Sequence, residues 1–364
     1  MVNDNYMKDL INSNDFIVRC AALSYFNESY SRDSEVVDRV IDAVRKYDDS
    51  FERNYLMANC ENLNINETQI NKLMNLDYGE DIYFKNNIVT LTIKQGIDVI
   101  ESFYDKIQEK KFFINKDSSL ELFEHYNKLK TLDECSTENL LKQLKDLANN
   151  NEERKENDFD YDKGINIGKI LSDREDLNLE YIIKELKNEN SKYYVIYLVY
   201  ILGELRDKSC IDILISKLKE NDDLTNEVIG EALSKIGGDT VIQAVYKKML
   251  ECNNTSIRLY VSMVFESIKT DFSAKTCFKL LEKENTKTMR GVLASALCKS
   301  YEVKYIDYIA DIVKNENYNK SILNLKRELL ATAKINNVKL KNMDCLQRRV
   351  EYKLDDLKDV NLSL

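Results

Sequence analysis

The chain contains no proline and no tryptophan, and it has only nine glycines among 364 residues. At a usage of roughly 5%, a chain of this length would carry well over ten prolines. Proline ends helices and glycine weakens them, so their scarcity favours nearly continuous helix. Lys, Asn, Ile and Tyr are abundant, as in proteins from AT-rich bacterial genomes, and this coding bias also contributes to the pattern.

Histidine is almost absent too, and His125 is the single one. A site with several His ligands is therefore excluded, and histidine-assisted catalysis would have to use this residue. Glu121 precedes it by one helical turn, which favours a surface contact. We find no phosphate loop, dinucleotide fingerprint or nucleophile elbow. The sequence thus predicts no catalytic residue, no metal and no cofactor.

An acidic segment has the beginning of a calcium loop but not its end. Asp158, Asp160 and Asp162 follow the D-x-D-x-D spacing. An EF-hand loop needs Gly at its sixth place and Glu at its twelfth, where this chain has Lys163 and Lys169. We expect a solvated acidic loop here; weak Ca²⁺ binding is the alternative.

The eight cysteines are scattered without a C-x-x-C pair, unlike the dense cysteines of a disulfide scaffold. The first fifteen residues contain early acids and no apolar core of a secretory signal. The longest apolar run, 193–202, has ten residues, whereas a membrane span needs about 20. These features predict a cytoplasmic protein with no membrane contact.

Acidic residues outnumber basic ones, mainly in the first part of the chain. Residues 1–200 carry 26 basic and 39 acidic side chains, and residues 201–364 carry 27 and 24. An acidic body repels phosphate backbones, so general nucleic-acid binding is unlikely on charge grounds. A local nucleic-acid contact by the neutral second part stays open.

A helical unit recurs in the second half of the chain. The segments ILGEL (201–205), ALSKI (232–236), VFESI (264–268) and ALCKS (296–300) follow one another at steps of 31, 32 and 32 residues. A repeat of this length is one helix–turn–helix unit, and stacked copies form a solenoid. The apolar spacing predicts helix pairs at 191–205 and 209–220, 224–236 and 240–252, 255–268 and 273–284, and 287–300 and 304–314, then a helix at 321–333.

Residues between the predicted helices carry the expected end signals. Gly237 and Gly238 follow one first helix, and Asp239 and Thr240 can then cap the next. Tyr193, Tyr197 and Tyr200 share one helical face, which predicts a place in the core between repeats. An aromatic partner site is the alternative for these tyrosines.

The pattern resembles HEAT repeats, particularly the short bacterial HEAT-like type first described in phycobilin lyases. The best match is 231–268, where Ile257 and Arg258 correspond to the hydrophobic–Arg pair that opens the first helix. The family often has proline early in the second helix; Asp212, Gln243 and Lys275 stand there instead. The resemblance implies an all-α, right-handed α-α superhelix.

A looser version of the unit precedes it. Val18-Arg19 and Glu52-Arg53 open two first helices 34 residues apart, and 34–47 and 67–76 are the second helices expected beside them. We therefore divide the chain into degenerate repeats at 1–112, an irregular helical segment at 113–190 with a polar joint near 149–163, and HEAT-like repeats with a C-terminal helical cap at 191–364.

Second helices of such repeats usually line the concave face. Lys217, Lys247, Lys248 and Lys279 occupy exposed positions of these helices in the expected register, which predicts a basic stripe for an acidic peptide or protein. Ordinary helix solvation is the alternative. We expect a non-enzymatic scaffold, adaptor- or immunity-like, that binds another protein or peptide. The resemblance also leaves open a HEAT-like enzyme, similar to a bilin lyase or a DNA glycosylase.

Overall fold

The computed structural model describes residues 2–76, 81–110, 116–152 and 161–340, with side chains except at 106–119 and 151–152. Helix accounts for 75% of the chain, and these ranges contain no strand. The all-α prediction is therefore confirmed. Within the same ranges, every helix is too short or too polar to cross a bilayer.

The helices group into two compact units, one made of 95–268 and the other of 1–94 together with 269–364. The helices of the first unit are α7 (Ile97–Lys110), α8 (Lys116–Asp133), α9 (Thr137–Glu152), α10 (Tyr161–Ser172), α11 (Leu179–Asn188), α12 (Lys192–Leu205), α13 (Ile211–Ser216), α14 (Asp223–Ile236), α15 (Asp239–Glu251), α16 (Thr255–Val261) and α17 (Met263–Ser267).

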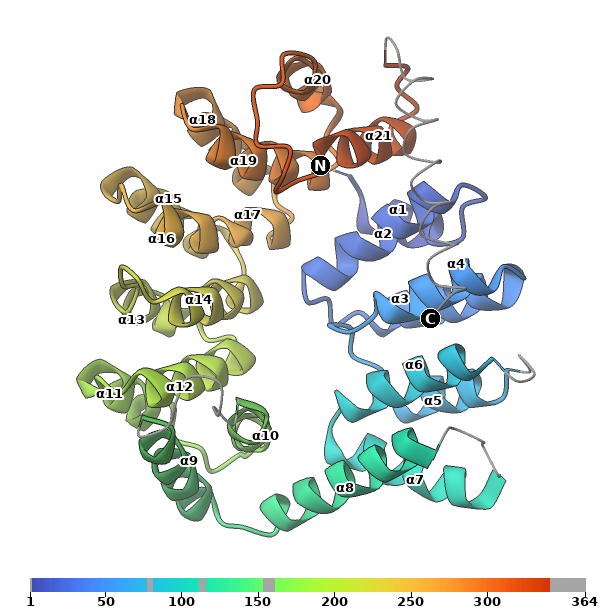
Figure 1. The fold of residues 1–364 in the computed structure, drawn as a ribbon, viewed down its shortest axis with the longest axis vertical. Helices are drawn as coiled ribbons and strands as arrows, with labels where there is room; N and C mark the ends of the chain where they lie inside the picture. The colour runs from blue at the N-terminus through green and yellow to red at the C-terminus, as the bar shows by residue number, and fades with distance from the viewer. Residues whose placement is uncertain (1, 77–80, 111–115, 153–160, 341–364) are drawn as a thin grey trace. The chain divides into compact units, whose positions relative to one another are not determined.

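Within 95–268, first and second helices of the repeats form two layers (Figure 1). Helices α10, α12, α14 and α16 pack side by side in what we call the first-helix layer, and α11, α13 and α15 form the second-helix layer. Helix α12 also contacts α9 and α11, so it is apolar on nearly every side. Tyr193 and Tyr197 are buried there, which confirms their predicted place in the core.

The other unit joins both ends of the chain. Its helices are α1 (Asp4–Leu10), α2 (Phe16–Glu28), α3 (Ser34–Lys46), α4 (Ser50–Ala58), α5 (Glu67–Met74), α6 (Ile82–Ile93), α18 (Asp271–Lys283), α19 (Lys287–Lys299), α20 (Ile306–Lys314) and α21 (Leu325–Ile335). Here α19, α21, α2, α4 and α6 pack in succession, so the N-terminal repeats stack on the last described helix.

Polar contacts fix this junction of the two ends. The Tyr301 hydroxyl donates to the Ala21 carbonyl at 3.0 Å, and the Tyr6 hydroxyl donates to the Ile335 carbonyl at 2.8 Å. Lys334 Nζ lies 2.5 Å from an Asp15 carboxylate oxygen. An isolated solenoid exposes an apolar surface at each end. In this unit each end of the described chain covers the other.

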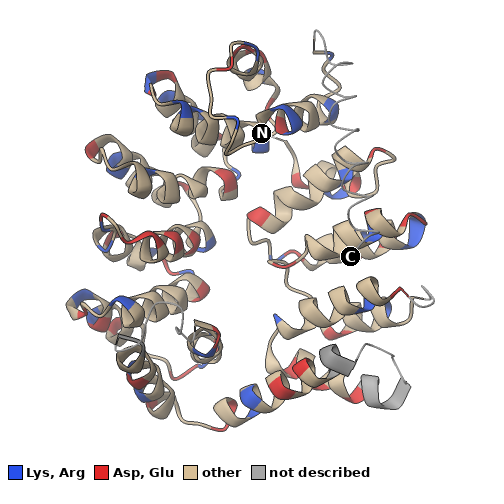
Figure 2. Cartoon of the chain, in the orientation of Figure 1, with Lys and Arg blue, Asp and Glu red and all other residues tan. Residues whose placement is uncertain are grey.

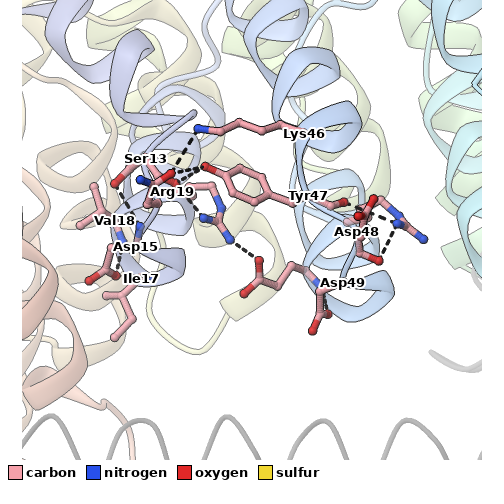
Figure 3. A network of polar contacts seen from close by, with 12 residues as sticks. Ser13, Asp15, Ile17, Val18, Arg19, Lys46, Tyr47, Asp48 and Asp49 are labelled. Atoms are coloured by element: carbon pink, nitrogen blue, oxygen red, sulfur yellow. Dashed lines mark hydrogen bonds and ion pairs between the residues drawn. The ribbon is translucent and has the colours of Figure 1, made fainter.

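Arginines of the first helices hold the turns between repeats. Figure 3 shows Arg19 inside such a turn, where its Nη1 donates to the Ser13 carbonyl at 2.7 Å. The same guanidinium pairs with Glu52 and lies 3.8 Å from the centre of the Tyr47 ring. Arg53 and Arg290 likewise donate to carbonyls five or six residues upstream. These arginines close the repeat turns rather than facing a ligand.

Several sequence predictions need local correction. The polar joint expected at 149–163 is shorter, because α9 continues to Glu152 and α10 begins at Tyr161; 153–160 lie outside the described residues. The single helix expected at 255–268 is interrupted at Ser262. Asp239 does not cap α15, because Gly238 occupies the N-cap position with φ +84°. The three-part division of the chain and the superhelix hand stay predictions.

Candidate interaction surface

The lysines predicted to form a stripe do not behave alike. Lys217 is buried, and its ammonium donates to the carbonyls of Lys187 at 3.4 Å and Glu189 at 2.8 Å. Burial lowers its pKa. It therefore closes the C-terminal end of α11, and the prediction that it is exposed is wrong. The burial of Lys217 could not be predicted from its position in the repeat, because its acceptors are backbone carbonyls of the preceding repeat.

The other three lysines are accessible to different degrees. Lys247 is exposed and Lys248 is half-buried, both on α15, while Lys279 is exposed on α18. Lys279 belongs to the other compact unit, and Lys247 and Lys248 are neighbours on α15. A partner for these lysines on a concave face stays a prediction.

The first-helix layer of 95–268 is packed unusually closely, because glycines occupy its helix contacts. A Cβ placed on Gly164 would lie 1.9 Å from the Tyr197 ring, and one on Gly168 would lie 2.9 Å from the Tyr200 ring. Gly203 lies against Ala232 in the same way, and Gly230 lies against the Tyr260 carbonyl. Four of the nine glycines thus bring α10, α12, α14 and α16 together. Such contacts make a rigid platform.

An acidic stripe runs along α14 in this layer, and Figure 2 shows the acidic residues along this helix. Asp223, Glu227 and Glu231 follow one another at four-residue spacing and therefore share one helical face. Like charges at this spacing destabilise a helix by about 0.2–0.5 kcal/mol per pair. The three acids therefore lower the stability of α14 rather than raising it.

Tyrosines from the neighbouring helices lie beside these acids. Burial and then the Glu231 and Glu227 carboxylates raise the pKa of Tyr161 to about 12. The pKa of Tyr260 is raised by burial and by Asp223 and Glu227. Because these acids influence the pKa values of the tyrosines on the neighbouring helices, we group them as one surface. We call it the acid–tyrosine face: Tyr161, Tyr200, Glu204, Asp223, Glu227, Glu231 and Tyr260.

One end of this face already holds cations of the chain itself. Lys235 Nζ bonds to Glu204 at 2.9 Å and lies 5.0 Å from the centre of the Tyr200 ring. Lys169 donates to the Gln95 carbonyl at 2.8 Å, and burial lowers its pKa to about 8. An ammonium seated between a carboxylate and a tyrosine ring is stabilised by both charge and the ring quadrupole.

The residues of the acid–tyrosine face are carboxylates and tyrosines. Among the described residues, no cluster of three or more His, Cys, Asp or Glu could hold a metal ion. Asp162 lies in the first turn of α10, so this part of the suspected calcium loop is helical. His125 lies half-buried on α8, remote in sequence from the face.

Charge is divided unevenly between the two compact units. Residues 95–268 carry 24 basic and 34 acidic side chains, for a net charge of −10. The remaining residues carry 29 of each sign and are neutral. The whole excess of acid thus belongs to the unit that contains the acid–tyrosine face. The division at residue 200 used in the sequence analysis could not show this, because it cut through the unit.

A pocket of about 470 Å³ lies at the joined chain ends, lined by residues such as Tyr6, Tyr301 and Val303. Its lysine, Lys304, pairs with Glu302 and with Asp271.

Comparison with known proteins does not identify a family for this chain. No family model and no curated protein matches the chain. A crystal structure of an engineered protein from the Northeast Structural Genomics Consortium is similar over 92% of this chain and 99% of its own, with 15% identity and a TM-score of 0.35. This similarity is too weak to carry an argument about function.

Proposed function

We propose that the chain is a HEAT-like helical-repeat scaffold that binds another protein or peptide through the acid–tyrosine face. The observation that carries this proposal is the combination of acids and tyrosines across α10, α12, α14 and α16, on helices that glycines hold close together. Tyrosine supplies a large contact area at low entropic cost. An adaptor-like or immunity-like role would use such a face in the same way.

The same features weigh against the enzyme alternative. A DNA glycosylase must bring a phosphate backbone close to its surface, and a unit with a net charge of −10 repels one. We also propose that the protein works in a reducing cytosol. All the cysteines in the described part of the chain are free thiols, and Cys20, Cys60, Cys210, Cys277 and Cys298 are buried.

The proposal is tested by photocrosslinking in the source cell. A photoreactive amino acid replaces Thr255, an exposed residue at the start of α16 beside the face, in one variant and Lys247 on the second-helix layer in another. We expect one protein to crosslink at position 255 and not at position 247, and to bind again when both proteins are purified. Crosslinking at neither position, or only at 247, would refute binding by this face.

A further inference from the structure

The Tyr200 end of the face shows how a cation sits on this surface. Lys235 reaches from α14 to α12, where it meets the Glu204 carboxylate at 2.9 Å and the Tyr200 ring at 5.0 Å. Its side chain is 12% exposed, so the ammonium is largely withdrawn from water. A cation is thus stable here because a carboxylate and a tyrosine ring act together.

The other end of the face presents the same two groups on α14 and α16. Ser256 donates a hydrogen bond to Asp223, which fixes the register between these helices. Tyr260 lies one turn beyond Ser256, and Glu227 lies one turn beyond Asp223, so the ring and the carboxylate run in parallel. Gly230 keeps the α16 backbone close, with the Tyr260 carbonyl 2.6 Å from where a Cβ would stand.

We propose that this end of the acid–tyrosine face, formed by Asp223, Glu227 and Tyr260, binds an arginine-rich segment of the partner protein. The inference rests on the proposed function and names the chemistry of its partner. Glu227 and Asp223 are exposed, and Tyr260 is half-buried, so all three are accessible from solvent. Charge complementarity selects a cationic segment, because residues 95–268 carry the whole net charge of −10.

Arginine fits this arrangement better than lysine does. Its planar guanidinium stacks on a tyrosine ring while its N–H groups bond to a carboxylate in a fixed fork. Two carboxylates one helical turn apart, beside one ring, match that geometry. The chain itself shows the combination in its other unit, where Arg19 lies on the Tyr47 ring and pairs with Glu52.

The test is a fluorescence-anisotropy titration of the full chain with labelled peptides at moderate salt. One peptide alternates arginine and serine, a second has lysine at each arginine position, and a third has glutamate there. We expect the arginine peptide to bind about tenfold more tightly than the lysine peptide. The glutamate peptide should not bind. Equal binding of the arginine and lysine peptides would overturn the inference.

Variants locate the binding. D223N and E227Q together should weaken the arginine peptide about tenfold. Y260L should weaken it comparably, whereas Y260F keeps the ring and should bind like the wild type. The matched control is E251Q, which removes an exposed acid from α15 in the second-helix layer. An equal loss in E251Q and in the face variants would mean nonspecific attraction and overturn the inference.

Folding and function remain separable in this design. Helical circular dichroism and thermal unfolding of each variant show whether the fold is kept. If a partner crosslinks at position 255 but the arginine peptide fails to bind, the proposed function holds and the arginine inference is wrong. If nothing crosslinks there, the proposed function itself fails.

Discussion

The substitution G164A tests the close packing of the first-helix layer. Gly164 lies on α10 against the Tyr197 ring of α12, and Tyr197 is 0% exposed. A Cβ at Gly164 would lie 1.9 Å from Tyr197 Cε1. Carbon atoms in contact prefer about 3.5–4.0 Å, so the ring or the helix would have to move by about 2 Å. A buried ring has no open space into which it can move.

The expected magnitude follows from two opposing terms. Overpacking of this kind costs about 1–3 kcal/mol and sometimes more. Replacing a helical glycine by alanine contributes about 1 kcal/mol in the other direction. Because the overlap is severe, we expect G164A to lower the free energy of unfolding by about 2 kcal/mol. The measurement is chemical denaturation of the full chain, followed by circular dichroism.

A matched control is G291A on α19, where the nearest atom is the flexible tip of Leu323 at 3.3 Å. This variant should be as stable as the wild type or up to about 1 kcal/mol more stable. A double variant, G164A with Y197L, should lose less stability than the two single variants together. If G164A proves as stable as G291A, α10 does not pack on α12 as described.

Three further predictions concern the core, a repeat turn and a buried lysine. Leu214→Asp places a charge at a fully buried site of α13 and should lower the free energy of unfolding, measured by denaturation, by several kcal/mol. S216D on the exposed side of the same helix should change it little. Equal effects of the two substitutions would contradict the packing. Arg19→Lys loses the contact with the Tyr47 ring and the forked donors, so it should lower the free energy of unfolding by about 2 kcal/mol. R45K at an exposed site should change it little. If R19K is as stable as the wild type, the arginines do not stabilise the repeat turns. Burial lowers the pKa of Lys169 to about 8 in the folded chain. Between about pH 8 and 10 the unfolded chain therefore binds more protons at this lysine than the folded chain does. The free energy of unfolding should then rise with pH, by at most about 1.4 kcal/mol per pH unit. The rise should vanish in K169M, and the same slope in both proteins would refute the assignment.

Local periodicity was enough to predict the helices themselves. The pairs expected near 224–236 and 240–252 correspond to α14 and α15 within one residue, because an apolar stripe at i, i+3 and i+4 is a local signal. The buried tyrosines of α12 were predicted from the same spacing. The end of α9 was not, since polar residues continue that helix without a stop signal. The break at Ser262 was not predicted either, because apolar residues continue on both sides of it.

The candidate surface was harder to predict, because it depends on contacts between repeats. The stripe of Asp223, Glu227 and Glu231 can be read from the sequence, but the tyrosines beside it come from helices about 30 residues or more away. The packing role of Gly164 and Gly168 could not be predicted, since only the structure shows which rings lie against them. Lys217 was misplaced for the same reason, because its partners are backbone carbonyls of another repeat.

The joining of the chain ends also lies beyond local pattern. The N-terminal and C-terminal repeats were expected as separate segments, whereas α2 packs on α21 within one unit. The contacts that join them, such as Tyr301 to Ala21, link residues about 280 positions apart. No periodicity in one sequence encodes a pairing at that separation.

The most direct test of the central claim is the affinity of the purified chain for the partner protein recovered by crosslinking. Isothermal titration compares the wild type with the pair D223N and E227Q on the acid–tyrosine face, and with the pair K247Q and K248Q on α15. We predict that the face variant weakens binding about tenfold or more, while the lysine variant changes it less than about twofold. Undiminished binding by the face variant, with loss in the lysine variant, would contradict the account and favour the basic stripe instead.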